Sequence, residues 1–287
     1  MAKRNTNDWN ENKLNRFLKE HRGEGTGIDY KPWLTIQDFP TLGKATRIMG
    51  YISKRQHNFF SDTQLKYFFL LDWEKNKILD IREHYPLLDA EDILRQESDL
   101  NLKLFKDKES HVPYILSTTF LITLKKSNGE IVDVARSIKG ASELDKKITL
   151  EKLEIERRYW KAKSIDFGIV TNKDIPSIRS KNIEWLHTAL MADEYNGFTK
   201  DDLNELSQGL LERFIKNQQN IRKIISEYET DYRLEPGIGL FLFKYLVANR
   251  KIHLNIDETI NINASGKSLV IIEKSVEGER VNDADFC

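Results

Sequence analysis

The clearest hydrophobic pattern in the chain is a pair of apolar segments joined by a short polar turn. Residues 114–124 and 130–135 are rich in β-branched and aromatic side chains, as strands are. Between them, Lys126-Ser127-Asn128-Gly129 has the composition of a hairpin turn. A helix with many aromatic residues precedes the pair, and Ser61 or Asp62 is suited to cap it. The pattern therefore predicts a core helix packed on a β-hairpin.

The other elements of the first half alternate between strands and helices. A short polar helix is expected within residues 1–20, and residues 78–82 predict a short strand. Residues 148–163 predict a strong helix, and residues 166–171 a short buried strand. Residues 89–112 are highly charged and weakly patterned, which favours an insertion or a mobile loop. The order strand, strand, helix, strand indicates an α/β fold with a mixed sheet flanked by helices.

The character of the chain changes after residue 175. Four successive helices are predicted, at residues 182–191, 200–214, 217–228 and 238–248, and then two strands, at residues 251–256 and 268–272. Helices followed by a two-stranded hairpin suggest a winged-helix unit. We therefore predict an N-terminal domain of residues 1–175 and a C-terminal domain of residues 176–287. The polar tail, residues 277–287, is expected to be disordered.

Composition narrows the class of protein without identifying it. The 287 residues exceed one average domain, and a hydrophobic content of 39% is enough for a core. The 45 basic residues balance 45 acidic ones, which argues against a generally cationic nucleic-acid coat but not against a local basic groove. One cysteine, Cys287, provides no disulfide framework. Neither a membrane helix nor a signal peptide is apparent, so we expect a soluble intracellular protein.

The core helix and the hairpin carry the skeleton of a site for cutting phosphodiesters. Metal-assisted hydrolysis needs carboxylates to hold a hard cation, a lysine or the metal to activate water, and rigid strands to fix these groups. Ser137 and Lys139 are two residues apart on the second strand, so they share one face. Thr119 lies on the preceding strand and Gln64 on the helix. Neutral side chains thus stand where acidic ones would be needed.

Several further segments resemble the TnsA family, the endonuclease subunits of Tn-seven-type heteromeric transposases. The matching segments are Gly23-Glu24-Gly25-Thr26-Gly27, Tyr30 with Pro32-Trp33-Leu34-Thr35, Leu79-Asp80-Ile81-Arg82-Glu83, Pro86-Leu87-Leu88, the run from Thr149 to Trp160, and Asn182-Ile183-Glu184-Trp185-Leu186. Together they span nearly the first two thirds of the chain. The resemblance implies a restriction-endonuclease-like N-terminal domain and a winged-helix-like C-terminal domain.

The resemblance also implies an activity and a set of partners. TnsA proteins cut the 5′ strands at transposon ends with Mg²⁺ during DNA transposition, a form of DNA recombination. A TnsB-like transposase cuts and joins the 3′ ends, and a TnsC-like AAA+ ATPase binds TnsA through the C-terminal domain. The expected partners are therefore transposon-end DNA and these two proteins, in the cytoplasm of a bacterium and without a membrane.

The chain departs from the family at its catalytic positions. The resemblance assigns these positions to Gln64, Thr119, Ser137 and Lys139, and the first three are also its metal-ligand positions. The family has glutamate, aspartate and glutamine at those three, so only Lys139 is retained. Because neutral oxygens hold a divalent cation far less firmly than carboxylates do, we expect Mg²⁺ not to be bound tightly. The sequence therefore predicts an architectural subunit that is impaired in cleavage.

Two other interpretations are compatible with the sequence. One is an active endonuclease with a relocated metal site built from Glu83, Asp133 and Lys139, although a salt bridge or support role is the stronger interpretation of Glu83. The other is a nucleic-acid-binding regulator with a winged helix. Lys44, Arg47 and Lys139 are the residues that we expect to line a DNA path.

Two charged or glycine-rich stretches receive plainer interpretations. The run Glu151–Arg158 is interpreted first as the exposed face of its helix, and only second as a contact surface. The stretch Gly23–Gly27 has no apolar strand before it and no helix after it, so a surface loop is favoured over a phosphate-binding loop.

Overall fold

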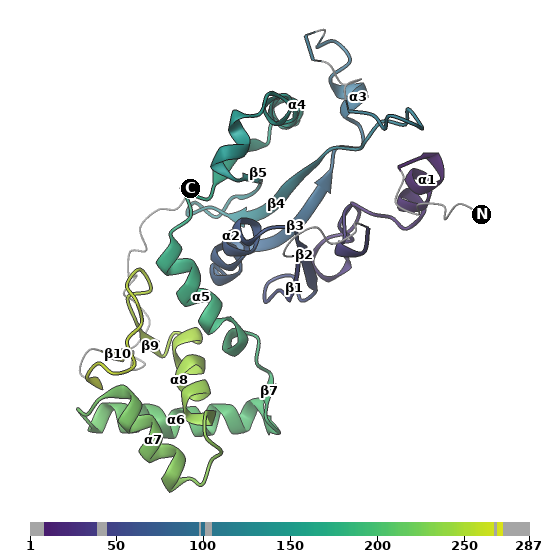
Figure 1. Cartoon of the computed structure of the whole chain (residues 1–287). Helices are drawn as coiled ribbons and strands as arrows, with labels where there is room; N and C mark the ends of the chain where they lie inside the picture. Colours follow the sequence, from purple (N-terminus) through teal and green to yellow (C-terminus); the bar gives the residue numbers. More distant parts are fainter. Residues whose placement is uncertain (1–8, 39–44, 98, 101–104, 267–268, 272–287) are drawn as a thin grey trace. The chain divides into compact units, whose positions relative to one another are not determined.

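The computed structural model comprises two compact units, residues 1–184 and residues 185–287 (Figure 1). The residues that it describes are 9–38, 45–97, 99–100, 105–266 and 269–271. The division between the units falls inside helix α5 (Ser177–Leu190), and the boundary predicted after residue 175 lies just before that helix. The predicted disordered tail lies outside the described residues.

A mixed four-stranded sheet forms the centre of the N-terminal unit (Figure 1). Its strands, in spatial order, are β3 (Ile78–Pro86), β4 (Ser117–Lys125), β5 (Ile131–Lys139) and β6 (Asp166–Thr171). The first three are antiparallel, and β6 runs parallel to β5 after the crossover helix α4 (Lys147–Ala162). The predicted mixed sheet and the predicted β4–β5 hairpin are both confirmed, and Gly129 supplies the positive φ of 87° that the turn needs.

Helix α2 (Asp62–Trp73) and helix α4 cover opposite faces of this sheet. Tyr67 of α2 contacts Phe120, with ring centroids 5.8 Å apart. Trp160 of α4 belongs to the buried cluster that contains Leu121. Because successive residues of a strand point to opposite faces, Phe120 and Leu121 of β4 assign one helix to each face. The predicted restriction-endonuclease-like arrangement, a mixed sheet with flanking helices, is therefore present.

Two strand predictions differ from the structure. Strand β3 continues to Pro86, well beyond the predicted end at residue 82. Strand β6 lies at the edge of the sheet, with Asp166 and Ile169 exposed, and is not the buried strand that its apolar residues suggested. Only one face of β6 is covered, because Phe167 packs on the cluster beneath α4.

The charged segment of residues 89–112, predicted as an insertion or a mobile loop, packs on α4 in its described parts, which agrees with an insertion. Leu94 and Phe105 are buried in the same cluster as Trp160, and a short helix, α3 (Ala90–Ile93), lies at its start. Arg158 of α4 forms ion pairs with Glu97 and with an aspartate two residues later. The acidic side chains that suggested a solvated loop are thus ion-pair partners of the helix.

The N-terminal segment folds around three aromatic rings. Helix α1 (Glu11–Lys19) buries Phe17 against Trp9 and Trp33, with ring centroids 5.6 Å and 5.2 Å apart. Two 3-10 turns follow, η1 (Gly27–Asp29) and η2 (Ile36–Asp38). The glycine-rich stretch lies against the central sheet, because the Gly27 amide donates to Asp80 Oδ2 over 3.1 Å. This contact gives the stretch a structural role.

A second hairpin, absent from the sequence prediction, precedes α2. Strands β1 (Thr46–Met49) and β2 (Gln56–Phe59) pair in antiparallel register. At Gly50, which ends β1, an added Cβ would lie 2.7 Å from both His57 Nε2 and Ser53 Oγ. Glycine is therefore needed where the turn folds back onto its own buried polar side chains.

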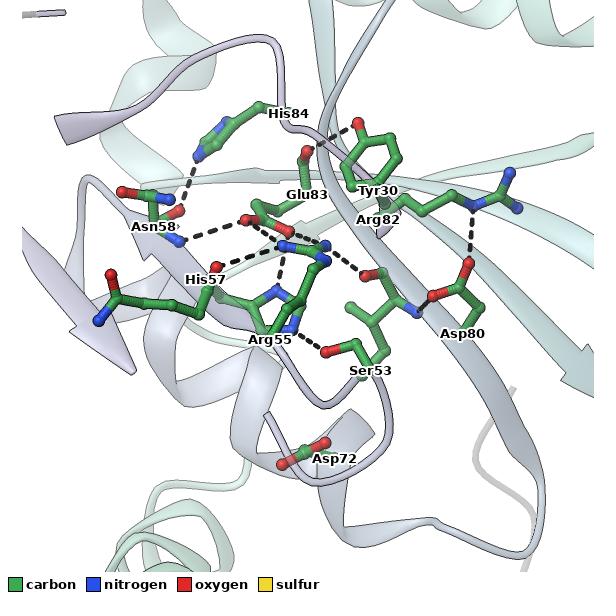
Figure 2. Close-up of polar contacts among 12 residues, drawn as sticks. Tyr30, Ser53, Arg55, His57, Asn58, Asp72, Asp80, Arg82, Glu83 and His84 are labelled. Carbon is green, nitrogen blue, oxygen red and sulfur yellow. Dashed lines mark hydrogen bonds and ion pairs between the residues drawn. The ribbon is translucent and has the colours of Figure 1, made fainter. Parts of the chain in front are cut away.

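This hairpin is fixed to the central sheet through the buried carboxylate of Glu83 (Figure 2). Arg55 pairs with both carboxylate oxygens, and its Nη1 donates to Oε1 over 2.9 Å. His57 Nδ1 lies 2.8 Å from Oε2, and the amide of Asn58 donates to Oε1 over 3.3 Å. Arg55, His57 and Asn58 of this hairpin thus all contact the side chain of Glu83 on β3. We call this group the Glu83 anchor.

The electrostatics of the Glu83 anchor favour the ionised carboxylate. Burial by itself raises the pKa of Glu83. The His57 ring and the Arg55 guanidinium together lower it by more than burial raises it, so its pKa lies well below the ordinary range. An ionised carboxylate accepts hydrogen bonds only, so His57 Nδ1 is the donor in its contact. The other ring nitrogen lies 2.6 Å from Ser53 Oγ, which fixes the orientation of the ring.

The C-terminal unit consists of helices followed by a small sheet. A short hairpin, β7 (Glu194–Tyr195) and β8 (Phe198–Thr199), precedes α6 (Lys200–Lys216), α7 (Ile221–Asp231) and α8 (Ile238–Ala248), and then β9 (Ile252–His253) pairs antiparallel with β10 (Val270–Ile271). Almost every residue of α8 is buried, which places this helix at the centre of the unit. Thr199 caps α6, and its side chain accepts the backbone amide of Asp202. The winged-helix assignment stays a prediction. Over the described residues, no helix has the length and apolarity needed to cross a membrane.

Replacing Glu83 with alanine should destabilise the protein strongly. The change leaves the buried Arg55 guanidinium without its carboxylate, and breaking a buried pair in this way costs about 3–5 kcal/mol. Urea unfolding followed by circular dichroism measures the change in the free energy of unfolding. Glu91→Ala, at an exposed position of α3, is the matched control and should shift it by less than about 0.5 kcal/mol. Equal effects of the two changes would contradict the anchor.

The contribution of Glu83 should also depend on pH. The folded-state pKa lies below the ordinary value of 4.5, so the folded protein binds fewer protons than the unfolded chain in acid. The stabilisation is therefore fully present above about pH 5 and is lost as the pH falls below about 4. We expect the stability difference between the wild type and Glu83→Gln to shrink from pH 7 to pH 3. A difference that stays constant over this range would exclude an ionised Glu83 as the anchor.

Candidate functional site

The candidate site lies where strands β4 and β5 separate. Their backbone pairing ends at Phe120 and Arg136, although β5 stays paired with β6 as far as Lys139. Just past this point Thr119 is buried, and its Oγ1 accepts the amide of Ile138 over 3.0 Å. A side-chain hydroxyl thus replaces the next backbone bond between the strands. The structure places Thr119 at the predicted site, but as a bridge between its two strands.

Ser137 lies on β5 opposite this opening and faces helix α4. Its side chain is buried, and Oγ donates to Glu156 Oε1 over 3.4 Å. Lys139 follows two residues later on the same face, at the end of the strand, and is half-buried. The charge of Lys139 acts on the Glu156 carboxyl and lowers its pKa.

Glu156 is the functional candidate that sequence reasoning missed. It lies within the run Glu151–Arg158, which was interpreted as an exposed face, yet its side chain is buried. A signal for it was present, because Thr149, Leu153, Glu156 and Trp160 form one stripe at helical spacing on α4. Because the other three residues of this stripe pack into the core, the carboxyl of Glu156 is expected to be buried with them.

The environment of Glu156 makes ionisation costly. Burial raises the pKa of the Glu156 carboxyl to about 7, and the opposing influence of Lys139 and of hydrogen bonds with Thr118 and Ser137 is smaller. Among the described residues, Oε2 of this carboxyl has no hydrogen-bond partner. Lys152, one helical turn before Glu156, has its pKa lowered by burial and by the charge of Lys139. Two lysines and one acid therefore meet at the opening between β4 and β5.

Gln64 is engaged elsewhere in its own element. Its side-chain Oε1 accepts the backbone amide of Phe60 over 2.9 Å, and its backbone amide donates to Ser61 Oγ over 3.2 Å. These two bonds close the N-terminus of α2, with Ser61 as the predicted N-cap. Within the described part of the chain, no hydrogen bond joins Gln64 to Thr119 or to the β5 residues.

The relocated metal site of Glu83, Asp133 and Lys139 is not assembled. Glu83 is sealed in the anchor with Arg55 and His57 (Figure 2). Asp133 Oδ1 accepts hydrogen bonds from Arg82, over 2.8 Å, and from the hydroxyl of a threonine on β4. Each carboxylate is therefore held by its own cation, and the support role interpreted for Glu83 is the one that the structure shows.

The two other residues predicted to line a DNA path have different outcomes. Lys44 lies outside the described residues. Arg47 is exposed on β1 and pairs in register with Asn58. The second hairpin therefore presents Arg47 to solvent from a fixed backbone.

The donor groups at the family positions do not fit a tightly held divalent cation. The oxygens of Gln64, Thr119 and Ser137 are neutral, and each already takes part in a hydrogen bond within the chain. Across the described residues, no group of three or more histidine, cysteine, aspartate or glutamate side chains is placed to hold a metal ion. Proteins usually hold Mg²⁺ through one or two ionised carboxylates together with waters and substrate phosphates, whereas burial raises the pKa of the Glu156 carboxyl and so disfavours its ionised form.

Glu156→Gln should change how stability depends on pH. Because the folded-state pKa is about 7 and the ordinary value is 4.5, the folded protein binds more protons than the unfolded chain between these values. Wild-type stability is therefore expected to fall as the pH rises from 4.5 to 7, by up to about 3 kcal/mol. The variant should lack this fall when unfolding is measured in urea at pH 5 and at pH 7.5. Parallel curves for the two proteins would show that Glu156 titrates normally.

Comparison with known families matches both halves of the chain. Residues 75–172 match the family model described as TnsA-like endonuclease N terminal. Residues 174–256 match the model described as TnsA endonuclease C terminal. The two matches meet within the short connection between β6 and α5.

A comparison with curated proteins agrees with these family models. The chain is 36% identical over 266 residues to the Transposon Tn7 transposition protein TnsA of Escherichia coli, and the match covers 92% of each chain. It is long enough to include the second hairpin, the site at the β4–β5 opening and the C-terminal helices. On the two family models and this relative, the chain belongs to the TnsA family.

Proposed function

We propose that this chain is the TnsA-type subunit of a Tn7-type transposase and that it acts at transposon ends with reduced capacity to cut the 5′ strands. Membership of the family supports the first part. TnsA-family endonucleases are generally Mg²⁺-dependent, and the composition of the site supports the second part. The role that remains is architectural, because binding DNA and partners does not require a metal.

The observation that carries this proposal is the use of the family positions within the fold. Thr119 bridges β4 and β5, Ser137 binds Glu156, and Gln64 caps α2. A ligand position in a working site keeps its oxygens available for a cation, with carboxylates to balance the charge. Here the same positions serve packing and strand pairing.

Lys139 retains a function in this proposal. Lys139 lies at the end of β5, beside the β4–β5 opening. Its charge lowers the pKa values of Glu156 and Lys152. In the absence of a carboxylate pair, a lysine there attracts the phosphate backbone directly. Lys139 would then hold DNA at the opening without contributing to bond cleavage.

The proposed partners follow from the family and from the two-unit organisation. A TnsB-like transposase would process the 3′ ends, and a TnsC-like AAA+ ATPase would contact the C-terminal unit. If the 5′ strands stay uncut, transposition leaves the donor joined to the target and yields cointegrates. This outcome distinguishes an architectural subunit from an active one.

Restoring the family residues should restore metal binding. Titration calorimetry of the full chain with Mn²⁺ is expected to show no specific site in the wild type. The variant Gln64→Glu/Thr119→Asp/Ser137→Gln should bind Mn²⁺, because it supplies two carboxylates at the family's metal-ligand positions. The same two proteins, combined with the TnsB-like and TnsC-like partners and labelled transposon-end DNA, should give uncut and cut 5′ strands respectively.

The control for this experiment keeps the restored oxygens and removes the lysine. Adding Lys139→Ala to the triple variant should leave Mn²⁺ binding in place and abolish 5′ cleavage, since lysine offsets charge in the reaction but is no metal ligand. Cleavage of the 5′ strands by the wild type, at a rate near that of the triple variant, would refute the proposal.

A further inference from the structure

We propose that the turn of the second hairpin is a docking site for the phosphodiester backbone of duplex DNA. The turn carries Tyr51 and Lys54, and the C-terminal end of α2 brings Lys75 beside them. Together with Arg47 on β1, these residues form what we call the hairpin patch. The inference rests on the proposed function, which makes DNA the substrate class, and it names the surface that meets the DNA.

The first observation is the arrangement of two cations about one ring. Lys54 Nζ lies 4.0 Å from the centroid of the Tyr51 ring, and Lys75 Nζ lies 5.2 Å from it. Two ammonium groups are thus held near each other by an aromatic platform. Neighbouring phosphates of a nucleic-acid strand present repeated negative charges that such a pair can neutralise.

The second observation is that the charges of Arg47 and Lys54 are not cancelled by ion pairs among the described residues. Across the described residues, neither Arg47 nor Lys54 takes part in an ion pair, whereas the arginines of α4 are paired with carboxylates. Both side chains are exposed. In a chain with 45 basic and 45 acidic residues, cations that remain exposed and uncompensated are available for an anionic partner.

The third observation is that the turn is rigid. Asp72 of α2 is fully buried and accepts the amides of Tyr51 and Ile52 over 2.7 Å and 2.9 Å. Beneath it, Arg55 and His57 hold the hairpin to β3 through the Glu83 anchor (Figure 2). The exposed cations therefore lie on a backbone fixed from two sides by buried carboxylates, so little conformational entropy is lost when DNA docks.

The turn holds Lys54 in a backbone conformation that is costly for a residue other than glycine. Lys54 adopts a φ of 55°, in the left-handed region that non-glycine residues seldom occupy. Glycine adopts this conformation at a lower cost. Retaining a lysine at this position keeps its ammonium over the ring of Tyr51.

The test is the salt dependence of DNA affinity measured with the full chain. Fluorescence anisotropy with a labelled 30-base-pair duplex, in EDTA and without partner proteins, gives the slope of log affinity against log salt. The variant Arg47→Ala/Lys54→Ala/Lys75→Ala should lose at least about tenfold in affinity at 50 mM salt. Its slope should fall by about 3, because each lost phosphate contact removes about 0.9.

A matched control removes the same charge from other elements of the same unit. The variant Lys126→Ala/Lys161→Ala/Lys173→Ala changes exposed lysines at the β4–β5 turn, at the end of α4 and after β6. It should keep the slope and lose less than about twofold in affinity. Similar losses in both triple variants, or no binding of duplex by the wild type at 50 mM salt, would overturn the proposal.

Two further arms keep the result unambiguous. The variant Lys54→Arg/Lys75→Arg preserves both charges and should retain the wild-type slope, and matching thermal unfolding of all variants excludes misfolding. If the hairpin patch served an acidic protein surface instead, the alanine variant would bind DNA normally, which contradicts the proposal. Because the assay contains neither metal nor partners, its outcome is independent of whether the chain cleaves 5′ strands.

Discussion

The ionised carboxylate of Glu83 is buried inside the N-terminal unit and fixes the second hairpin to the central sheet. The positions of the exposed side chains of this hairpin depend on that contact. Burying a charge costs several kcal/mol, and the cost is offset here only because Arg55, His57 and a backbone amide converge on the same two oxygens. The residues that satisfy Glu83 come from one hairpin and Glu83 itself from the central sheet. The hairpin therefore cannot shift relative to the sheet without exposing an unpaired buried charge. This coupling also removes Glu83 from the acids that could hold a metal.

The β4–β5 opening follows a different physical rule. There the strands part, and polar side chains take over bonds that the backbone no longer makes, as Thr119 does for the amide of Ile138. A neutral hydroxyl performs that task as well as a carboxylate does, and it adds no buried charge. The single acid that remains, Glu156, is driven toward its protonated form by burial. In the proposed architectural subunit, this opening is therefore a mostly neutral region whose charge comes from Lys139 and Lys152.

The sequence predicted those elements whose periodicity is undisturbed. The core helix, the β4–β5 hairpin and the crossover helix all have unbroken apolar patterns, and each was found. The β1–β2 hairpin was missed because β2 buries His57 and Asn58, polar residues whose partners lie on a distant strand. Glu156 was missed for the same reason, since a carboxylate among charged neighbours looks exposed until the opposite strand is in place. In both cases the information lay in a tertiary contact between segments far apart in the chain, which local composition does not contain.

In the proposed architectural subunit, neutral residues at the family's catalytic positions need not weaken the scaffold. Carboxylates gathered around an empty metal site repel one another, so a site built for catalysis stores electrostatic strain whenever the metal is absent. Replacing them with hydroxyl and amide groups relieves the repulsion while Thr119 and Gln64 keep making the hydrogen bonds that join the strands and cap the helix. The hairpin patch, which we propose as the DNA-docking surface, is supported separately, by the buried carboxylates of Glu83 and Asp72. Because the two regions rest on different buried groups, chemistry can be lost from one while binding persists in the other.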